Sequence, residues 1–497
     1  MSTIRCPLQD IAHIAPQQPA WFEDGTAHMF PAMNVAARDI HRQFTQDAKI
    51  QPGDRVVIAA ATQWRWLPLL FAIFRAGAVA CPLNTRLPQA TLKERARGLS
   101  PKLQIIDDTA EPILPGIPCF RISNLCDVTM LGAPDRGPLE LDLERPATCI
   151  YTTGSSGHPK AVVHSLEAHY YSALGANRHL PLNHTHRWIL TLPLYHVGGI
   201  GVLFRCLLAG AAVVSETGTG PEKPLEKTGT GPEKTTTKTG TDPVRTMLEN
   251  RVTHLSLVPT QLIRLMRHEK AAELAKQLHT ILLGGAPIPR DLVARALDHG
   301  FPVHATYGMT ETASQVTTVA RNDDPDLRRE TDGMILPHRN IRMAPDGEIL
   351  VRGHTLALGL YQEGEIVPIV DDEGWYHTGD LGKLENQHLV VTGRKDNRFI
   401  SGGENIQPEE IERHLLEITG ASTVVVTPKP DPEFGHRPVA WLDLPKTDFT
   451  PGVWGQALRK FLPGYMIPVE FRELPESAGL KPDRRLLSDE LCGNKPA

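Results

Sequence analysis

Segments with the patterns of strands and of helices alternate along the first part of this 497-residue chain. Residues 55–60 read as a strand, residues 63–76 as a helix, and residues 79–83 as another strand. Strands separated by helices are typical of a parallel sheet covered by helices, and we expect the alternation to continue to about residue 390. A chain of this length also exceeds one ordinary domain. The sequence therefore predicts an α/β protein with at least two folding units.

The sequence pattern changes beyond Gly393. Proline and two acids at residues 408–410 favour a helix start, because proline fits the first turn and acids are favoured at the positive end of the helix dipole. Two apolar strand patterns and a further helix follow, up to residue 462. We therefore predict a large N-terminal α/β domain over residues 1–394 and a small, mobile α+β domain over residues 395–497.

Residues 216–242 form a low-complexity insertion in the large domain, and TGTGPEK occurs in it twice. The segment has almost no large apolar residues, so it cannot offset the entropy of ordering itself. We expect a surface insertion. A recognition loop is the alternative interpretation, since long loops can be functional.

Composition excludes several classes of function. The net charge of −5 without a basic stripe argues against a nucleic-acid partner. The N-terminus lacks the apolar stretch of a signal peptide, and the most apolar segment, residues 67–83, contains Arg75 and is too short to span a bilayer. The seven cysteines have no paired spacing. We therefore expect no disulfides, no zinc site, no membrane insertion and a cytoplasmic location.

A segment rich in glycine and hydroxyl groups follows an apolar strand at residues 150–160, which read IYTTGSSGHPK. Glycines let backbone N–H groups turn toward an anion, hydroxyls add donors, and a lysine adds charge. The candidate phosphate-binding residues are Thr152, Thr153, Gly154, Ser155, Ser156, Gly157 and Lys160. The spacing differs from a Walker A loop and from a Rossmann fingerprint. By itself the pattern fits a polyphosphate site or a flexible loop.

Six further motifs follow in order: LPLYHVGG at 192–199, LLGGAPI at 282–288, YGMTE at 307–311, YHTGDLG at 376–382, GRKDN at 393–397 and SGGENIQPEEIE at 401–412. With these motifs the chain resembles the adenylate-forming superfamily of acyl-CoA synthetases, luciferases and adenylation domains, over nearly its whole length outside the insertion. The resemblance implies two half-reactions. A carboxylate and ATP give an acyl-adenylate and pyrophosphate, and a thiol then displaces AMP.

The resemblance also implies roles at the nucleotide site. Tyr307 matches the aromatic residue that stacks on adenine, and Asp380 matches the carboxylate that accepts both ribose hydroxyls. Thr310 and Glu311 match a catalytic pair that contacts the α-phosphate, with Glu311 holding Mg²⁺. Without the resemblance, such residues would be typical of a helix cap or a turn. Further expected ATP and AMP contacts are Gly284, Gly285, Ala286, Gly308 and Arg394.

Three more implied roles fall in the C-terminal part. Lys481 matches the lysine that neutralises the substrate carboxylate and the α-phosphate during adenylation, and Lys460 is the alternative. Asp396 matches the hinge between the domains. Gly402 and Gly403 match the path of the pantetheine arm of CoA, although two glycines also fit an ordinary turn. Because no carrier module follows, we expect CoA to be the acceptor.

Arg205 lies within an apolar helix pattern that ends at Gly210. A guanidinium there is costly to bury unless it is paired. It is therefore a structural ion pair, a snorkelling side chain, or a group that awaits a second carboxylate on the substrate. The segment resembles the o-succinylbenzoate (2-succinylbenzoate)–CoA ligases of menaquinone biosynthesis, in which the corresponding arginine is implicated in reading the benzoate carboxylate. His196 and Ser256 are the other substrate-binding candidates, and Ser256 matches a pocket position in those enzymes.

The sequence thus predicts an acid–thiol ligase that uses ATP, Mg²⁺ and CoA to make 2-succinylbenzoyl-CoA. One alternative is a medium-chain or aryl acid–CoA ligase without a second substrate carboxylate. Another is a catalytically inactive binding protein of the same fold. Assembly into a homo-oligomer stays open.

Overall fold

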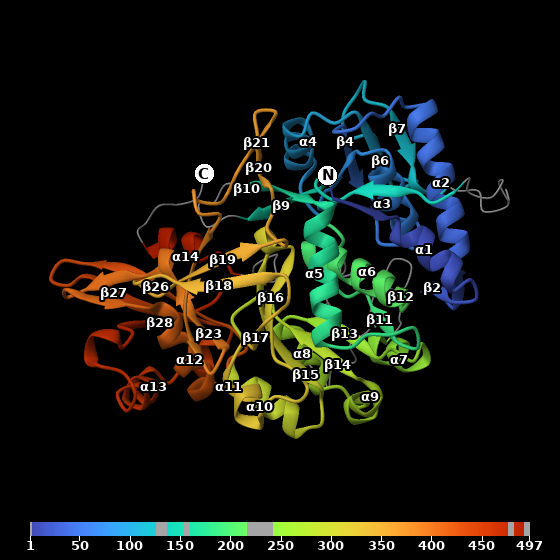
Figure 1. The fold of residues 1–497 in the computed structure, drawn as a ribbon. Coiled ribbons are helices and arrows are strands. Elements are labelled where there is room, and N and C mark those ends of the chain that lie inside the picture. Colours follow the sequence, from blue (N-terminus) through green and yellow to red (C-terminus); the bar gives the residue numbers. More distant parts are fainter. Residues whose placement is uncertain (1, 126–136, 154–158, 216–241, 476–481, 492–497) are drawn as a thin grey trace.

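The computed structural model describes residues 2–125, 137–153, 159–215, 242–475 and 482–491. Two large sheets dominate the chain up to Arg394 (Figure 1). The first has eight strands in the order β21 (Glu365–Val367), β20 (Gly359–Gln362), β10 (Pro159–Ser165), β9 (Pro146–Thr153), β5 (Val79–Pro82), β4 (Arg55–Ala59), β6 (Leu103–Ile106) and β7 (Cys119–Arg121). The strands from β9 to β7 are parallel, and β9, β10, β20 and β21 pair antiparallel to one another.

The second sheet has thirteen strands. Their order is β18 (Arg339–Met343), β19 (Glu348–Gly353), β22 (Tyr376–Glu385), β23 (His388–Arg394), β17 (Met334–Ile335), β16 (Ser314–Thr318), β15 (Val303–Met309), β14 (Thr280–Leu283), β13 (His254–Leu257), β11 (Arg187–Ile189), β12 (Ala212–Ser215), β2 (Pro19–Glu23) and β3 (Thr26–Met29). A separate pair joins β1 (Thr3–Arg5) to β8 (Glu140–Asp142).

Helices of the same region connect and cover these strands. They are α1 (Pro7–Ile14), α2 (Phe30–Gln46), α3 (Trp66–Arg75), α4 (Gln89–Gly98), α5 (Leu166–His179), α6 (Val197–Ala209), α7 (Pro243–Glu249), α8 (Pro259–Met266), α9 (Ala271–Gln277), α10 (Arg290–Asp298) and α11 (Pro325–Glu330). No helix among the described residues is both long enough and apolar enough to cross a membrane. The predicted insertion, residues 216–242, lies outside the described residues except for Asp242, which caps the start of α7.

The predicted alternation of strands and helices ends earlier than expected. It holds up to β15, but from β16 to β23 the strands pair antiparallel, and α11, with six residues, is the only α-helix described between them. Short strands joined by tight turns can pair with their neighbours without a crossover helix. The expectation that alternation would continue to about residue 390 was therefore wrong.

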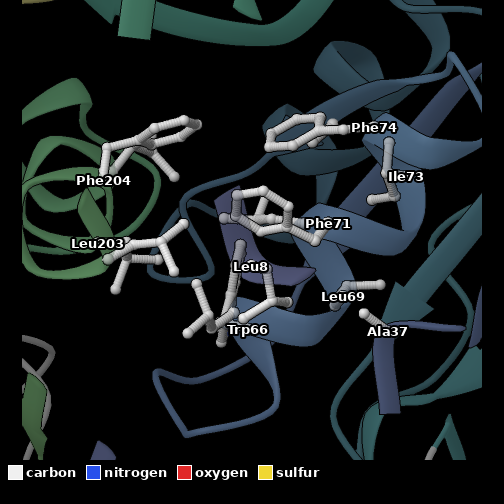
Figure 2. Packing of buried hydrophobic residues seen from close by; sticks show 14 of the residues in the cluster. Leu8, Ala37, Trp66, Leu69, Phe71, Ile73, Phe74, Leu203 and Phe204 are labelled. Atoms are coloured by element: carbon white, nitrogen blue, oxygen red, sulfur yellow. The ribbon is translucent and has the colours of Figure 1, made fainter. Parts of the chain in front are cut away.

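Helix α6 lies between α3 and strand β11 (Figure 1). Its side chains Leu203 and Phe204 face Phe71 and Phe74 of α3 (Figure 2), with the ring of Phe204 centred 6.1 Å from each of the other two rings. A fully buried side chain of this kind contributes about 1.5–3 kcal/mol. The helix ends at Gly210, which has a left-handed φ of 65° that favours glycine. This packing fixes the direction of the next side chain, Arg205.

The C-terminal segment has its own hydrophobic core. Strands β24 (Phe399–Ser401) and β25 (Glu404–Ile406) form a hairpin, and β26 (Val424–Asp431), β27 (Gly435–Leu442) and β28 (Glu470–Glu473) form a three-stranded sheet. Helices α12 (Pro408–Thr419), α13 (Pro451–Leu458) and α14 (Arg484–Leu491) complete it. The buried apolar clusters here contain only residues from Phe399 onward, and Figure 1 shows the segment to one side of the molecule. The domain boundary at 394/395 and the mobility of the segment stay predictions.

Candidate active site

The carboxyl ends of four neighbouring parallel strands, β11, β13, β14 and β15, meet at one edge of the larger sheet. Ser256 lies in β13, Gly284 directly follows β14, and Tyr307 lies near the end of β15. Thr310 begins the short helix η2 (Thr310–Thr312) that follows β15, and the exposed His196 directly precedes α6. Ligands of parallel sheets bind outside the carboxyl ends of the strands. The fold therefore gathers residues from three separate motifs, together with Ser256, at the place where a ligand is expected.

Asp380 joins three other predicted residues in one polar cluster. Its Oδ1 accepts a hydrogen bond from Arg394 Nη1 at 2.7 Å, and its Oδ2 accepts one from the Tyr307 hydroxyl at 2.8 Å. Asp380 and Arg394 are directly paired across β22 and β23. Arg394 Nη2 also donates to Asp396 Oδ2 at 3.2 Å. Since Asp396 lies in η3 (Lys395–Asn397), the predicted hinge and the predicted ribose carboxylate share one arginine.

The glycines of two motifs permit close approach of the backbone. A Cβ on Gly284 would lie 2.7 Å from Thr306 Cγ2 and 2.9 Å from the Thr306 carbonyl oxygen. Gly285 has a left-handed φ of 77°, and Ala286 follows it. A Cβ on Gly308 would lie 1.8 Å from the Ser314 carbonyl oxygen, so glycine is needed there for the pairing of β15 with β16. The requirement at Gly308 is thus structural, whatever its contact with a nucleotide.

A buried hydrogen-bond network fixes the position of Thr310. His164 of β10 lies 2.6 Å from the Thr310 carbonyl oxygen through Nε2. A carbonyl only accepts, so Nε2 carries the proton, and Nδ1 of neutral His164 accepts from the Thr148 hydroxyl at 3.2 Å. His169 Nε2 then donates to the Thr148 oxygen at 2.7 Å. Sequence reasoning missed all three of these residues, because no motif marks them.

Buried histidines make the stability of the protein sensitive to acid. Burial lowers the pKa of His164 and of His304 to about 4, and that of His254 to about 2. In the unfolded chain a histidine titrates near pH 6.5. Below that pH the unfolded state binds more protons than the folded state, so the stability contributed by the neutral histidines is lost as the pH falls from about 6.5 toward 4.

We therefore expect the free energy of unfolding, measured with urea, to fall on acidification from about pH 7 to pH 5. Each such histidine would contribute up to about 1.4 kcal/mol per pH unit. His304→Gln should make the dependence of the unfolding free energy on pH less steep, by the contribution of about one titrating histidine. Glutamine can still donate to the Val319 carbonyl, which His304 contacts at 2.9 Å, so the fold should be kept. An unchanged slope in that variant would contradict the assignment.

Glu311 has the properties expected of a magnesium ligand. Its carboxylate lies close enough to the Tyr376 side chain to help raise the pKa of that phenol, and it forms no ion pair with any described residue. Its backbone carbonyl accepts from Ala357 N at 2.8 Å. A hard oxygen donor of this kind suits Mg²⁺, which keeps waters and phosphate oxygens as its other ligands. The described residues contain no cluster of three or more His, Cys, Asp or Glu side chains that could hold a metal ion.

The predicted phosphate loop connects the hairpin strands β9 and β10, in which Thr152 pairs with the exposed Lys160. Thr153 ends β9. Because His164 of the same hairpin bonds to the Thr310 carbonyl, the hairpin is tied to η2. The remaining residues of the predicted loop, Gly154, Ser155, Ser156 and Gly157, lie outside the described residues.

Among the described residues Arg205 has no ion-pair partner, and its side chain does not reach solvent. It is 2% exposed, and its Nη1 donates to Gln315 Oε1 at 2.5 Å. Its guanidinium lies 4.7 Å from the ring centre of Trp188, and its Nε has no hydrogen-bond partner within the described chain. Burial lowers its pKa to about 10. Both structural alternatives weighed for Arg205 are therefore wrong for the described residues.

Ser256, 4% exposed, also has a side-chain oxygen without a hydrogen-bond partner among the described residues. Its backbone carbonyl accepts from Thr191 Oγ1 at 2.5 Å. A buried hydroxyl left in this way is costly unless a ligand or water completes it. This observation fits a substrate-lining position.

Apart from the predicted hinge, the candidate residues of the C-terminal segment have no described contact with the cluster around Asp380. Gly402 and Gly403 form the two-residue turn between β24 and β25, with φ values of 60° and 86°. Their local requirement is thus that of a hairpin turn, and a CoA contact stays a prediction. Lys460 is exposed and follows the end of α13. Lys481 lies outside the described residues.

A sequence profile of the family described as AMP-binding enzyme matches residues 8–361. The chain belongs to the AMP-binding enzyme family. It is similar to the 2-succinylbenzoate–CoA ligase of Salmonella typhimurium, with 34% identity over 90% of this chain and 89% of the relative. It is also similar to the 2-succinylbenzoate–CoA ligase of Escherichia coli strain K12, with 33% identity over 88% of this chain and 87% of the relative.

Solved structures lead to the same group. The o-succinylbenzoate CoA synthetase of Bacillus subtilis in complex with the acyl-adenylate intermediate OSB-AMP matches with a TM-score of 0.82 and 26% identity, over 98% of this chain and 99% of that one. The same enzyme in complex with ATP and magnesium ion matches with the same TM-score and identity, over 98% and 100%. The predicted adenylate-forming fold is confirmed.

Proposed function

We propose that this member of the AMP-binding enzyme family is an ATP-dependent acid–CoA ligase that converts 2-succinylbenzoate to 2-succinylbenzoyl-CoA. The observation that carries the substrate assignment is Arg205, a buried cation without a carboxylate partner among the described residues, near the ligand edge of the sheet. The similarity to 2-succinylbenzoate–CoA ligases over about nine-tenths of both chains supports the same assignment.

In this proposal the nucleotide occupies the carboxyl edge of the larger sheet. The β9–β10 loop and Lys160 bind its phosphates, and Tyr307 with residues 284–286 holds the adenine. Asp380 accepts the ribose hydroxyls. A carboxylate has about four lone-pair sites, so the Asp380 carboxylate can accept from ribose hydroxyls as well as from side chains of the protein.

Glu311 would hold Mg²⁺, which supplies positive charge against the phosphate oxygens. Thr310, whose carbonyl is fixed by His164, presents its hydroxyl to the α-phosphate. The reacting carboxylate of the acid attacks the α-phosphorus and releases pyrophosphate. The thiol sulfur of CoA then attacks the acyl carbon, and AMP leaves.

The acid would lie between α6 and the sheet. Arg205 binds the benzoate carboxylate, and Ser256 and His196 line the same pocket. Residues 395–497 would turn about Asp396 between the half-reactions, and Gly402 and Gly403 would line the path of CoA. A cytoplasmic location and a homo-oligomer remain predictions.

Pyrophosphate release with ATP, Mg²⁺ and a panel of acids tests the proposal. We expect 2-succinylbenzoate to give the highest kcat/KM, and the mass of the CoA product to be that of the monothioester. Highest activity with an aryl or medium-chain monocarboxylate would favour the alternative ligase. Binding of ATP without pyrophosphate release from any acid would favour an inactive binding protein.

Lys481→Ala is expected to slow acyl-adenylate formation by about 100-fold or more, because the lysine would neutralise two approaching anions. Thiolation of a supplied acyl-adenylate should be spared, since the small domain turns a different face to the site in that step. Single-turnover measurements of each half-reaction check this. Lys460→Ala is the matched control and should leave both steps unchanged, whereas the reverse pattern would show that Lys460 is the catalytic lysine.

A further inference from the structure

Two buried guanidiniums meet at Gln315. Arg205, Arg339 and Gln315 are 2%, 4% and 2% exposed. Arg205 Nη1 donates to the side-chain oxygen of Gln315, and Arg339 Nη1 donates to its backbone carbonyl. Arg339 also donates to the carbonyls of Pro337 and Ser172, at 3.1 and 3.3 Å. Every one of these acceptors is uncharged.

No described carboxylate forms an ion pair with either arginine. Burial, together with the positive charge of Arg205, lowers the pKa of Arg339 to about 9. Like charges held together without a counter-ion oppose folding, because each has lost its hydration without gaining an opposite charge. Such an arrangement is typical of a site that is completed by an anionic ligand.

The orientation of the Gln315 amide is fixed from its other end. Gln315 Nε2 lies 2.7 Å from the Thr318 hydroxyl oxygen, and that hydroxyl donates its own proton to the Thr317 carbonyl at 2.7 Å. The Thr318 oxygen must therefore accept from Gln315, which requires the amide nitrogen on that side. The amide oxygen consequently faces Arg205, and an exchange with the nitrogen would place two donors, the amide N–H and the guanidinium, against each other.

The remaining donors of Arg205 stay available. A guanidinium has five N–H groups. One N–H of Nη1 donates to Gln315, and Nε has no hydrogen-bond partner in the described part of the chain. The Trp188 ring packs against the guanidinium, with its centre 4.7 Å away. Gly201 lies under the group, since a Cβ on that residue would be 3.4 Å from Nη1 and Nη2.

We infer that Gln315 is a positioning residue that determines specificity for a substrate with a second carboxylate. This inference rests on the proposed function. The Gln315 amide accepts a hydrogen bond from Arg205 and so orients the guanidinium. Because the amide carries no charge, Arg205 keeps its attraction for a substrate anion. A glutamate at position 315 would also orient Arg205, but it would supply the negative charge that the substrate must otherwise bring.

The test compares Gln315→Glu with wild type on two acids: 2-succinylbenzoate, and 4-oxo-4-phenylbutanoate, which lacks the ring carboxylate. In Gln315→Glu we expect kcat/KM for 2-succinylbenzoate to fall at least about 10-fold, since a charge-assisted bond to the substrate is lost. The value for 4-oxo-4-phenylbutanoate should change less than about 3-fold or rise, because the pocket no longer holds an unpaired charge. The fall should appear mainly in KM.

Two further variants keep the result interpretable. Gln315→Met removes the acceptor without adding charge and should lose only part of the selectivity. Gln104→Glu is the matched control, because Gln104 is 1% exposed and its oxygen accepts from Ile113 N and Leu114 N at 2.9 and 3.1 Å. It should lower the melting temperature without changing the ratio of the two kcat/KM values.

If Gln315→Glu and Gln315→Met lost activity equally with both acids, the ratio of the two kcat/KM values would be unchanged. That result would overturn the inference and leave Gln315 as a structural residue. That outcome leaves the proposed function intact when the wild type prefers 2-succinylbenzoate. A wild type that activates only acids with one carboxylate overturns both.

Discussion

Asp380→Ala is expected to lower kcat/KM for ATP by at least about 100-fold. The carboxylate would accept two ribose hydroxyls, and each hydrogen bond to a charged group is worth about 1.5–3 kcal/mol, which corresponds to roughly 10²–10⁴-fold for the pair. The variant also deprives Arg394 and Tyr307 of the acceptor that they share. The loss should appear chiefly in KM for ATP, measured by pyrophosphate release.

Two controls separate this role from a loss of folding. Asp332 is also a buried carboxylate with an arginine partner, since Arg290 Nη2 donates to it at 2.7 Å, and it has no predicted nucleotide contact. Asp332→Ala should lower the melting temperature while KM for ATP stays the same. Tyr307→Phe should have a smaller effect than Asp380→Ala, because the ring remains. An Asp380→Ala protein with unchanged KM for ATP would refute the ribose role.

Arg205→Leu is expected to lower kcat/KM for 2-succinylbenzoate by at least about 10-fold, and by up to about 100-fold if both N–H donors of a forked contact are used. The same variant should keep or improve its activity with 4-oxo-4-phenylbutanoate, since leucine leaves no unpaired charge in the pocket. The swing in the ratio of the two kcat/KM values is the measurement. It is independent of how much active enzyme each preparation contains.

Arg205→Lys should recover only part of the loss, because a single ammonium cannot reproduce two parallel donors in one plane. Melting temperatures of both variants provide the control for folding. Arg205→Leu removes a buried charge and also leaves Gln315 without its donor, so we expect a small net change. Equal losses with both acids would show that Arg205 supports the fold and does not read the substrate.

Motif spacing was sufficient for the fold family, and it named most residues of the candidate nucleotide site, whose contacts with a nucleotide stay predictions. The YGMTE, YHTGDLG and GRKDN motifs named Tyr307, Asp380, Arg394 and Asp396, and the structure places these four in one hydrogen-bonded cluster. Local patterns also gave α6 and its end at Gly210. These features are recognisable because each is set by a short run of residues.

Two kinds of feature required the tertiary structure. The antiparallel region from β16 to β23 was mistaken for further alternation, because apolar periodicity identifies strands without saying which strands pair. The partners of Arg205 could not be predicted from the sequence either, since Gln315 lies 110 positions further along the chain. Nothing local to either residue marks the contact.

The sequence by itself determined that Arg205 sits in an apolar helix, and that a charge there needs an explanation. Only the tertiary structure argued against a snorkelling side chain and against an ion pair with a described carboxylate, because both depend on which groups surround the guanidinium. Packing of Leu203 and Phe204 against α3 turns Arg205 toward Trp188 and Gln315. Pairing of β15 with β16 brings Gln315 there, and an amide in place of a carboxylate leaves the charge of Arg205 uncompensated within the described protein.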